Sequence, residues 1–244
     1  MSSHRTIALS MLLGALIFAW VGWRSFASRR RPKTAAEVPT IIKQPVAFAS
    51  RTFDPAAPPA DMPPFTPGEQ AVCDSDFLSD ASVGGETRPS DATHATVTIT
   101  EIRVTLQLHI TIWAPSGATE HVMEHEDGHR QISEFYYQNA DALAGRIAAT
   151  YMGRQVDISG TDLGAASSKM LQQMATEITD EYNKELDPGP TQLLYDTITD
   201  HSRNGVVVKD AVAASIKNVV IASTRTTTKP DQRSRADGPA LDWS

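Results

Sequence analysis

Apolar and polar residues alternate strictly between residues 95 and 113, which predicts one long β-strand. After a slip of one residue at Thr100 and Glu101, the apolar positions continue with a period of two at Ile102, Val104, Leu106, Leu108, Ile110 and Ile112. A period of two places these side chains on one buried face, and the slip is typical of a β-bulge or a tight connection. His109 falls in the opposite phase, so we expect it to face away from the core.

The pattern after this strand changes to a helical period. Residues 117–152 contain no proline, and their apolar residues recur at roughly helical spacing: Val122, Ile132, Phe135, Tyr136, Leu143 and Ile147. We expect Ser116 to cap this long helix. Two further helices are predicted over residues 162–186 and 191–200, separated by the helix-stopping sequence Pro-Gly-Pro at 188–190.

The segments on either side of this pattern have a different composition. Residues 6–23 form an uncharged apolar run, and residues 32–68 hold nine of the 15 prolines. Proline lacks an amide donor and favours extended neighbours, so the second segment is typical of a semi-rigid spacer. We therefore divide the chain into a membrane anchor or signal sequence (1–30), a Pro-rich spacer (31–70), a folded domain (71–222) and a disordered tail (223–244).

The apolar run at residues 6–23 is long enough to cross a hydrocarbon core of about 30 Å as a helix. It is also long for a cleaved signal peptide, so we favour an uncleaved anchor, with cleavage near Ala27 as the alternative. Basic residues between Arg24 and Lys33 follow the run, and the positive-inside rule would keep the following domain in the cytoplasm. Charge counting therefore opposes export.

The charge balance argues against a nucleic-acid partner. The net charge is −7, and the only basic cluster lies before the expected folded domain, whereas phosphate binding needs a concentrated Lys/Arg surface. Cys73 is the single cysteine, which excludes an intramolecular disulfide and a cysteine-rich zinc site.

The candidate chemistry lies in the sequence H-E-D-G-H at residues 125–129, inside the predicted long helix. Residues four apart share a helix face, so His125 and His129 can converge on one zinc ion, and catalytic zinc sites leave one position for water. Glu126 follows the first ligand and is the candidate general base for that water. The alternative is a pair of surface histidines on a charged helix.

A third ligand has to come from elsewhere in the chain. His121 lies one turn before His125, but positions i, i+4 and i+8 span about 12 Å along a helix, too far for one ion. The spacing leaves several candidates open: His94, His109, Glu177, Glu181 and His201.

Two segments together resemble a known bacterial family. H-E-D-G-H-R-Q-I at 125–132, followed by Y-D-T-I-T-D-H-S-R-N-G at 195–205, is similar to the secreted zinc-dependent proteases catalogued as domain of unknown function 922. The resemblance covers roughly residues 95–205. Ser202 stands where that family usually has glycine. The matching residues are His125, Glu126, Gly128, His129, Ile132, Tyr195, Asp196, Thr199 and His201.

The resemblance implies a zincin-like α+β fold, with an antiparallel sheet packed against a long active-site helix and further helices. It implies that the zinc ligands are His125, His129 and His201, and that Glu126 activates water. Asp196 would orient a ligand imidazole, and Tyr195 would donate to the developing oxyanion. Residues 71–222 would then be a zinc metallopeptidase-like domain, and Gly128 would let another segment approach the active-site helix.

Because that family is described as secreted, we expect a single-pass anchor in the cell membrane with the domain periplasmic or extracellular, or secretion after cleavage. The expected function is zinc-dependent hydrolysis of peptide bonds in a peptide or protein substrate. The strand from Ile102 to Ile112 would offer an edge on which such a peptide could pair. The alternatives are a zinc-dependent amidase acting on another amide, such as a cell-wall cross-link, and a non-catalytic zinc-stabilised binding domain. The pattern predicts no oligomeric state.

Overall fold

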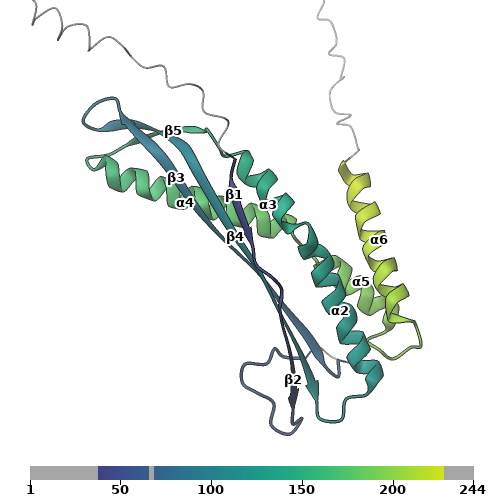
Figure 1. Cartoon of the computed structure of the whole chain (residues 1–244). Helices are drawn as coiled ribbons and strands as arrows, with labels where there is room; N and C mark the ends of the chain where they lie inside the picture. Colours follow the sequence, from purple (N-terminus) through teal and green to yellow (C-terminus); the bar gives the residue numbers. More distant parts are fainter. Residues whose placement is uncertain (1–37, 66–68, 228–244) are drawn as a thin grey trace, which may run out of the picture. The chain divides into compact units, whose positions relative to one another are not determined.

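Two long antiparallel strands form the centre of the domain. The computed structural model describes residues 38–65 and 69–227, which belong to a unit that begins at Val38. Strand β4 (His94–Pro115) pairs along nearly its whole length with β3 (Val72–Pro89) (Figure 1). Their register shifts between Gly84 and Gly85, opposite Thr100. The bulge predicted from the phase slip is therefore confirmed.

Three short strands share the other edge of β4. Strand β5 (Gln155–Ser159) is antiparallel to β4, whereas β1 (Thr40–Lys43) and β2 (Ala47–Phe53) are both parallel to it. The prediction of an antiparallel sheet is therefore wrong: the five-stranded sheet is mixed. The alternation of apolar and polar residues within β4 predicts which of its faces is buried. It does not indicate whether the neighbouring strands run parallel or antiparallel to β4.

The predicted spacer also needs correction, because β1 and β2 lie within residues 31–70 and pair with β4. Pro39 and Pro45 stand just outside the ends of β1. Proline is tolerated at the ends of edge strands, where no ladder hydrogen bond is lost. A proline-rich composition therefore did not exclude strands here, and the folded domain starts well before residue 71.

In the described part of the chain, two helices lie between β4 and β5 and three follow β5. The predicted long helix is divided at Asn139 into α2 (Glu120–Gln138) and α3 (Ala140–Ala149). The two later helices are confirmed as α4 (Leu163–Glu185) and α5 (Gly189–Thr199). Helix α6 (Val208–Thr227) continues into the predicted tail, whose remaining residues lie outside the described part of the chain.

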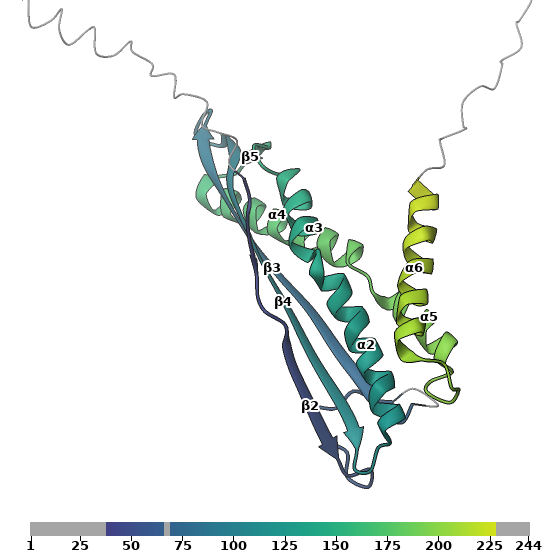
Figure 2. The same cartoon turned by 45° about the vertical axis from the view of Figure 1, so that its right-hand side comes forward.

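Helices α2, α3 and α4 cover one face of the sheet (Figures 1 and 2). The apolar phase of β4 points into this layer, and each of its side chains from Val97 to Ile112 is at most 2% exposed. His109 is exposed on the opposite face, as predicted. The fold is thus a two-layer arrangement of mixed α and β structure, and α2 lies against the sheet with its histidines near β3.

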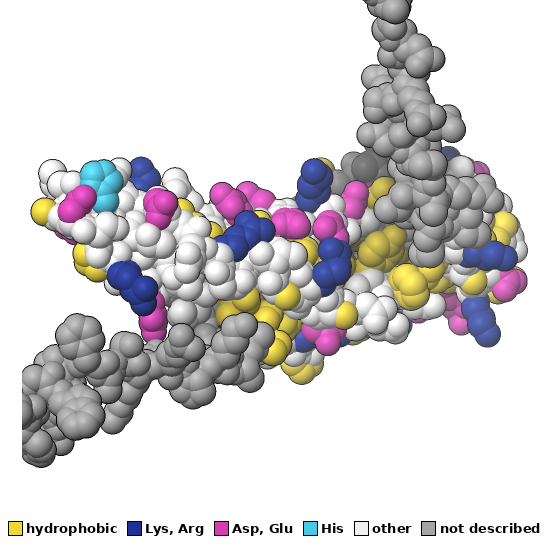
Figure 3. Space-filling view, turned by 90° about the horizontal axis from the view of Figure 1, so that it is seen from above, with side chains coloured by type: hydrophobic (Ala, Val, Ile, Leu, Met, Phe, Trp, Pro, Cys, Tyr) yellow, Lys and Arg dark blue, Asp and Glu magenta, His cyan; other side chains and the backbone are white. Residues whose placement is uncertain are grey.

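In the surface seen in Figure 3, basic side chains (Lys or Arg) and acidic side chains (Asp or Glu) are interspersed, with apolar patches between them.

Among the described residues, no helix is both long and apolar enough to cross a membrane. The predicted anchor or signal sequence at residues 1–30 lies outside the described residues.

Candidate metal centre

Helix α2 places His125 and His129 on its buried face, one turn apart. The helix begins after Thr119, whose hydroxyl accepts a hydrogen bond from the backbone N–H of Val122, so Thr119 rather than Ser116 is the N-cap. The Nε2 atoms of the two imidazoles are 3.3 Å apart. The convergence expected from the i, i+4 spacing is therefore present.

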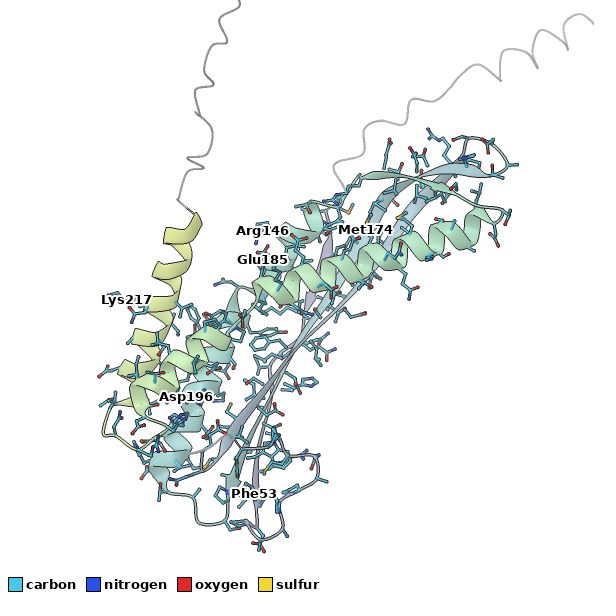
Figure 4. The ribbon with its side chains drawn as sticks, turned by 180° about the vertical axis from the view of Figure 1, so that it is seen from behind. Phe53, Arg146, Met174, Glu185, Asp196 and Lys217 are labelled. Carbon is cyan, nitrogen blue, oxygen red and sulfur yellow. The ribbon has the colours of Figure 1, made fainter. Side chains whose placement is uncertain are left out.

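Helix α5 brings a carboxylate to the same point. The Oδ1 atom of Asp196 lies 2.9 Å from Nε2 of His129 and 3.3 Å from Nε2 of His125. Figure 4 shows Asp196 on α5 beside α2. Burial alone would raise the pKa of Asp196, but the neighbouring His125 and His129 outweigh it and hold this pKa well below its ordinary value. The carboxylate is therefore ionised.

The three atoms fit the ligand spacing of a tetrahedral metal ion. Two ligand atoms at zinc distances of about 2.0–2.1 Å are separated by about 3.3–3.4 Å when the angle is tetrahedral. The observed separations are 3.3, 3.3 and 2.9 Å. His125, His129 and Asp196 therefore form a group that could hold a metal ion.

Gln192 fixes the proton of His129 on the far side of the ring. The Nδ1–H of His129 donates to Oε1 of Gln192 at 2.6 Å, while Nε2 of Gln192 donates to the His129 carbonyl and to the Ser133 hydroxyl. The other ring nitrogen, Nε2, therefore faces Asp196 and His125. Burial would lower the pKa of His129, but the hydrogen bond and the charge of Asp196 outweigh it and raise this pKa.

Sequence reasoning missed Gln192, although a signal was available. Gln192 and Asp196 are four residues apart on α5, so they share a helix face, as His125 and His129 do on α2. Two such pairs, one on each helix, form a single site if the two helix faces pack together. This packing of α5 on α2 is a tertiary contact, however, and no local sequence pattern indicates it.

His201, the predicted third ligand, is not one of this group. Its Nδ1 lies 3.6 Å from Oδ1 of Asp196, and this atom is buried without a hydrogen-bond partner among the described residues. Asp196, predicted to orient a ligand, is instead the third member of the group that could hold a metal ion. Asp196 lies within α5, whereas His201 follows the end of this helix at Thr199. Asp200, His201 and Ser202 all have left-handed φ angles of 49–62°, which turn the chain after the helix.

The left-handed backbone also bears on Ser202, which stands where the protease family usually has glycine. Ser202 has φ 62°, a region in which glycine is favoured because it has no Cβ. The glycine that usually stands there in the protease family would occupy this conformation without strain.

Tyr195 does not face the cleft, contrary to its predicted role as oxyanion donor. Its side chain is fully buried, and its hydroxyl donates to the backbone carbonyl of His125 at 3.0 Å. Its ring stacks on the His125 imidazole with centroids 5.0 Å apart. Tyr195 therefore positions His125 and joins α5 to α2.

We expect Tyr195→Phe to test this assignment. The loss of one buried hydrogen bond should lower the free energy of unfolding by about 1 kcal/mol. Any hydrolytic kcat should fall less than tenfold, whereas removal of an oxyanion donor costs about 10²–10³-fold. Urea unfolding and kcat of the purified variant measure both quantities. A fall in kcat of more than a hundredfold would return the oxyanion role to Tyr195.

Gly128 permits the close contact between the two helices. A Cβ added at Gly128 would stand 2.1 Å from the Tyr195 hydroxyl oxygen and 2.4 Å from the ring carbon that bears it. Real Cβ atoms never approach so closely, and Tyr195 is held by packing against Ile132 and Ala211. The expectation that another segment approaches the helix at Gly128 is therefore confirmed.

Gly128→Ala is expected to lower the free energy of unfolding by about 1–3 kcal/mol, because α5 must move away from α2. Gly145→Ala in α3 is the matched control, since its Cβ would meet nothing nearer than 3.7 Å. Alanine is the better helix former, so the control should be stabilised by about 0.5–1 kcal/mol. Thermal or urea unfolding compares the two variants. Equal effects would show that the Tyr195 contact is dispensable.

Glu126 faces a cleft next to the metal-binding group. The cleft has a volume of about 280 Å³, and it is bounded by α2, the first residues of β3 and the start of α5. Glu126 is 4% exposed. Burial, with added repulsion from Glu69 and Asp196, raises its pKa to about 7, although the charge of His129 and the backbone N–H of Cys73 oppose the rise. The candidate base therefore lies inside the cleft with a proton affinity suited to exchange near neutral pH.

The other candidate ligands lie elsewhere. His121 is exposed and donates to the Asn204 carbonyl, His94 contacts Asp91 at the tip of the β3–β4 hairpin, and Glu181 accepts from Tyr151. None of them, nor Glu177, is one of the group formed by His125, His129 and Asp196 within the described ranges.

Comparisons of the chain with protein-family models, with curated proteins and with solved structures found no match. The case for a function therefore depends on the residues and geometry of this centre.

Proposed function

We propose that the domain is a zinc-dependent hydrolase that cleaves peptide bonds, with a zincin-like site and a relationship to the secreted protease family that its two motifs resemble. One observation carries the proposal. Three electron-pair donors, on His125, His129 and Asp196, converge next to a buried carboxylate, Glu126, that opens on a cleft.

The donor set favours zinc among the common metal ions. Two imidazole nitrogens and one carboxylate oxygen match the three protein ligands of many catalytic zinc sites, whereas calcium and magnesium prefer oxygen ligands alone. Three protein ligands leave room for a water molecule or a substrate oxygen. The orientation of His129 by Gln192 is the kind of outer contact that such ligands usually have.

A bound zinc ion supplies Lewis acidity, which lowers the pKa of water and polarises a carbonyl. Glu126 then acts as the general base: its carboxylate accepts the proton of the attacking water and afterwards delivers it to the leaving amine. His125 and Glu126 are both buried, so this proton is exchanged in a site from which bulk water is largely excluded.

The cleft suits an extended peptide. Strand β4 is paired on both edges, so the expected substrate edge over Ile102–Ile112 is wrong. Strand β3 pairs with β4 alone among the described strands, and four of its first six residues line the cleft: Val72, Cys73, Ser75 and Phe77. The unpaired edge of β3 would therefore hold a peptide by backbone hydrogen bonds.

The test is removal and return of the metal. Purified protein is expected to contain about one zinc ion per chain and to cleave casein; extraction with 1,10-phenanthroline should abolish cleavage, and zinc should restore it. Metal content is measured by mass spectrometry, and cleavage is compared on casein and on peptidoglycan. Digestion of peptidoglycan alone would favour the amidase alternative. Protein without zinc and without cleavage of either substrate would overturn the proposal.

A further inference from the structure

The hydroxyl of Ser133 connects three elements at the floor of the cleft. Its Oγ atom lies 3.1 Å from the His129 carbonyl in its own helix and 2.9 Å from the Ser75 hydroxyl on β3, and it accepts from Nε2 of Gln192 on α5 at 3.0 Å. A serine inside a helix commonly bonds to a carbonyl of that helix or points to solvent. Ser133 is 0% exposed and has partners on two other elements as well. It therefore links α2 to both walls of the cleft.

These contacts decide which way the amide of Gln192 faces. The His129 carbonyl can only accept a hydrogen bond, and the single proton of the Ser133 hydroxyl is directed to that carbonyl or to Ser75. Both oxygen atoms therefore accept from Gln192, so its NH₂ group faces them and its Oε1 faces Nδ1 of His129. The reversed amide would place Oε1 against the His129 carbonyl, where two acceptors would repel each other.

The two imidazoles of the metal-binding group have separate supports. His125 is held by Tyr195, which donates to its backbone carbonyl and stacks on its ring. His129 is held by Gln192 through its Nδ1 atom. Hydrogen bonds of this kind fix the ring orientation of a metal-binding histidine. The position of the His129 ring therefore depends on a glutamine whose own orientation depends on Ser133.

We propose that Ser133 is a positioning residue of the metal centre, and that it acts through Gln192 on His129. This inference rests on the proposed function, because it names a residue that prepares the same site for its metal ion. Ser133 is fully buried, so it contacts no substrate. Loss of its hydroxyl should loosen the Gln192 amide and weaken metal binding, while the two histidines and the cleft remain in place.

The experiment measures the zinc affinity of full-length protein by competition with a chelating indicator. Loss of an outer hydrogen bond to a metal-binding histidine typically costs about 10–100-fold in affinity, so Gln192→Ala is expected to fall in this range. Ser133→Ala keeps the glutamine and should cost about three- to tenfold. In the double variant, Ser133→Ala should add nothing to the loss caused by Gln192→Ala, because the amide through which the hydroxyl acts is already gone.

Ser215→Ala is the matched control. Ser215 on α6 is also 0% exposed, and its hydroxyl donates to the carbonyl four residues earlier, at Ala211, at 2.8 Å. This bond stays within α6. The control therefore removes a buried serine hydroxyl away from the metal centre, and zinc affinity should stay within about twofold of the wild type.

A second readout needs no metal. In the metal-free wild type, the NH₂ group of Gln192 donates to two acceptors, so its protons should exchange slowly with solvent. Nuclear magnetic resonance should show exchange about tenfold faster in Ser133→Ala, since one of the two acceptors is lost. Ser215→Ala should leave the exchange rate unchanged.

The outcomes separate this inference from the hydrolase proposal. Unchanged zinc affinity in Ser133→Ala, equal losses in Ser133→Ala and Ser215→Ala, or additive losses in the double variant each overturn the role of Ser133. Exchange of the Gln192 amide that does not change in Ser133→Ala overturns it as well. A non-additive loss of affinity with faster exchange supports the role. If such a protein cleaves no peptide, the hydrolase proposal fails and the role of Ser133 stands.

Discussion

Glu126→Gln is expected to reduce kcat for peptide hydrolysis about 10²–10⁴-fold while the protein keeps its zinc and its fold. Glutamine has nearly the size and shape of glutamate, so the buried side chain at the cleft should still pack. Its amide cannot accept the proton of the attacking water, and the general-base contribution is lost. The measurement is kcat on a peptide substrate together with zinc content and circular dichroism of the same preparation.

The matched control for this prediction is Glu124→Gln, two residues earlier on α2. Glu124 is exposed and lines a different hollow, with His121 and Val207, so its replacement should leave kcat within about twofold of the wild type. Equal activity of both variants would remove Glu126 from the mechanism. Loss of zinc in Glu126→Gln would assign it a structural role.

The same variant separates the hydrolase from a zinc-stabilised binding domain. A binding domain needs the metal for its fold, so it should tolerate Glu126→Gln and unfold with His129→Ala. In a hydrolase, the first change removes activity without affecting the fold. The position of Glu126 favours the hydrolase, because burying a carboxylate is unfavourable for stability and is common where a base works.

The elements that could be predicted from the sequence are those whose own residues show an uninterrupted pattern of apolar and polar positions. Strand β4 and its bulge at Thr100 were predicted because the apolar phase of β4 is buried along its whole length, and the register requires one extra residue opposite Gly84 and Gly85. Strand β3 was not predicted, since several of its inward positions are Ser75, Ser79 and Ala81 rather than large apolar residues. Its pairing with β4 is a tertiary effect that alternation alone does not report.

The same division applies to the metal centre. The spacing of His125 and His129 is fixed by helix geometry, so their convergence and the adjacent position of Glu126 could be predicted without tertiary information. The third member of the group depends on how α5 packs on α2, which in turn depends on Gly128 and Tyr195. Asp196 and His201 are only five residues apart, but Asp196 lies within α5 and His201 lies in the left-handed turn at residues 200–202.

Asp196→Ala is therefore expected to have the largest effect on metal binding, and His201→Ala is its matched comparison. Removing a ligand should weaken zinc affinity by more than about 100-fold, beyond the 10–100-fold typical of residues that only orient a ligand. His201→Ala should weaken it by about tenfold or less, because its Nδ1 approaches Asp196 at 3.6 Å and lies outside the group of three. Competition with a chelating zinc indicator gives both affinities.

The metal-free proteins supply the folding control. Far-UV circular dichroism of the metal-free Asp196→Ala protein should match that of the metal-free wild type, because the Asp196 side chain contacts the two histidines rather than the apolar cluster around Tyr195. If His201→Ala loses more than 100-fold in zinc affinity and Asp196→Ala does not, the ligand set implied by the sequence resemblance is correct and Asp196 only orients it. If both lose that much, the ion has four protein ligands. No position would then remain for water, and the centre would be structural rather than catalytic.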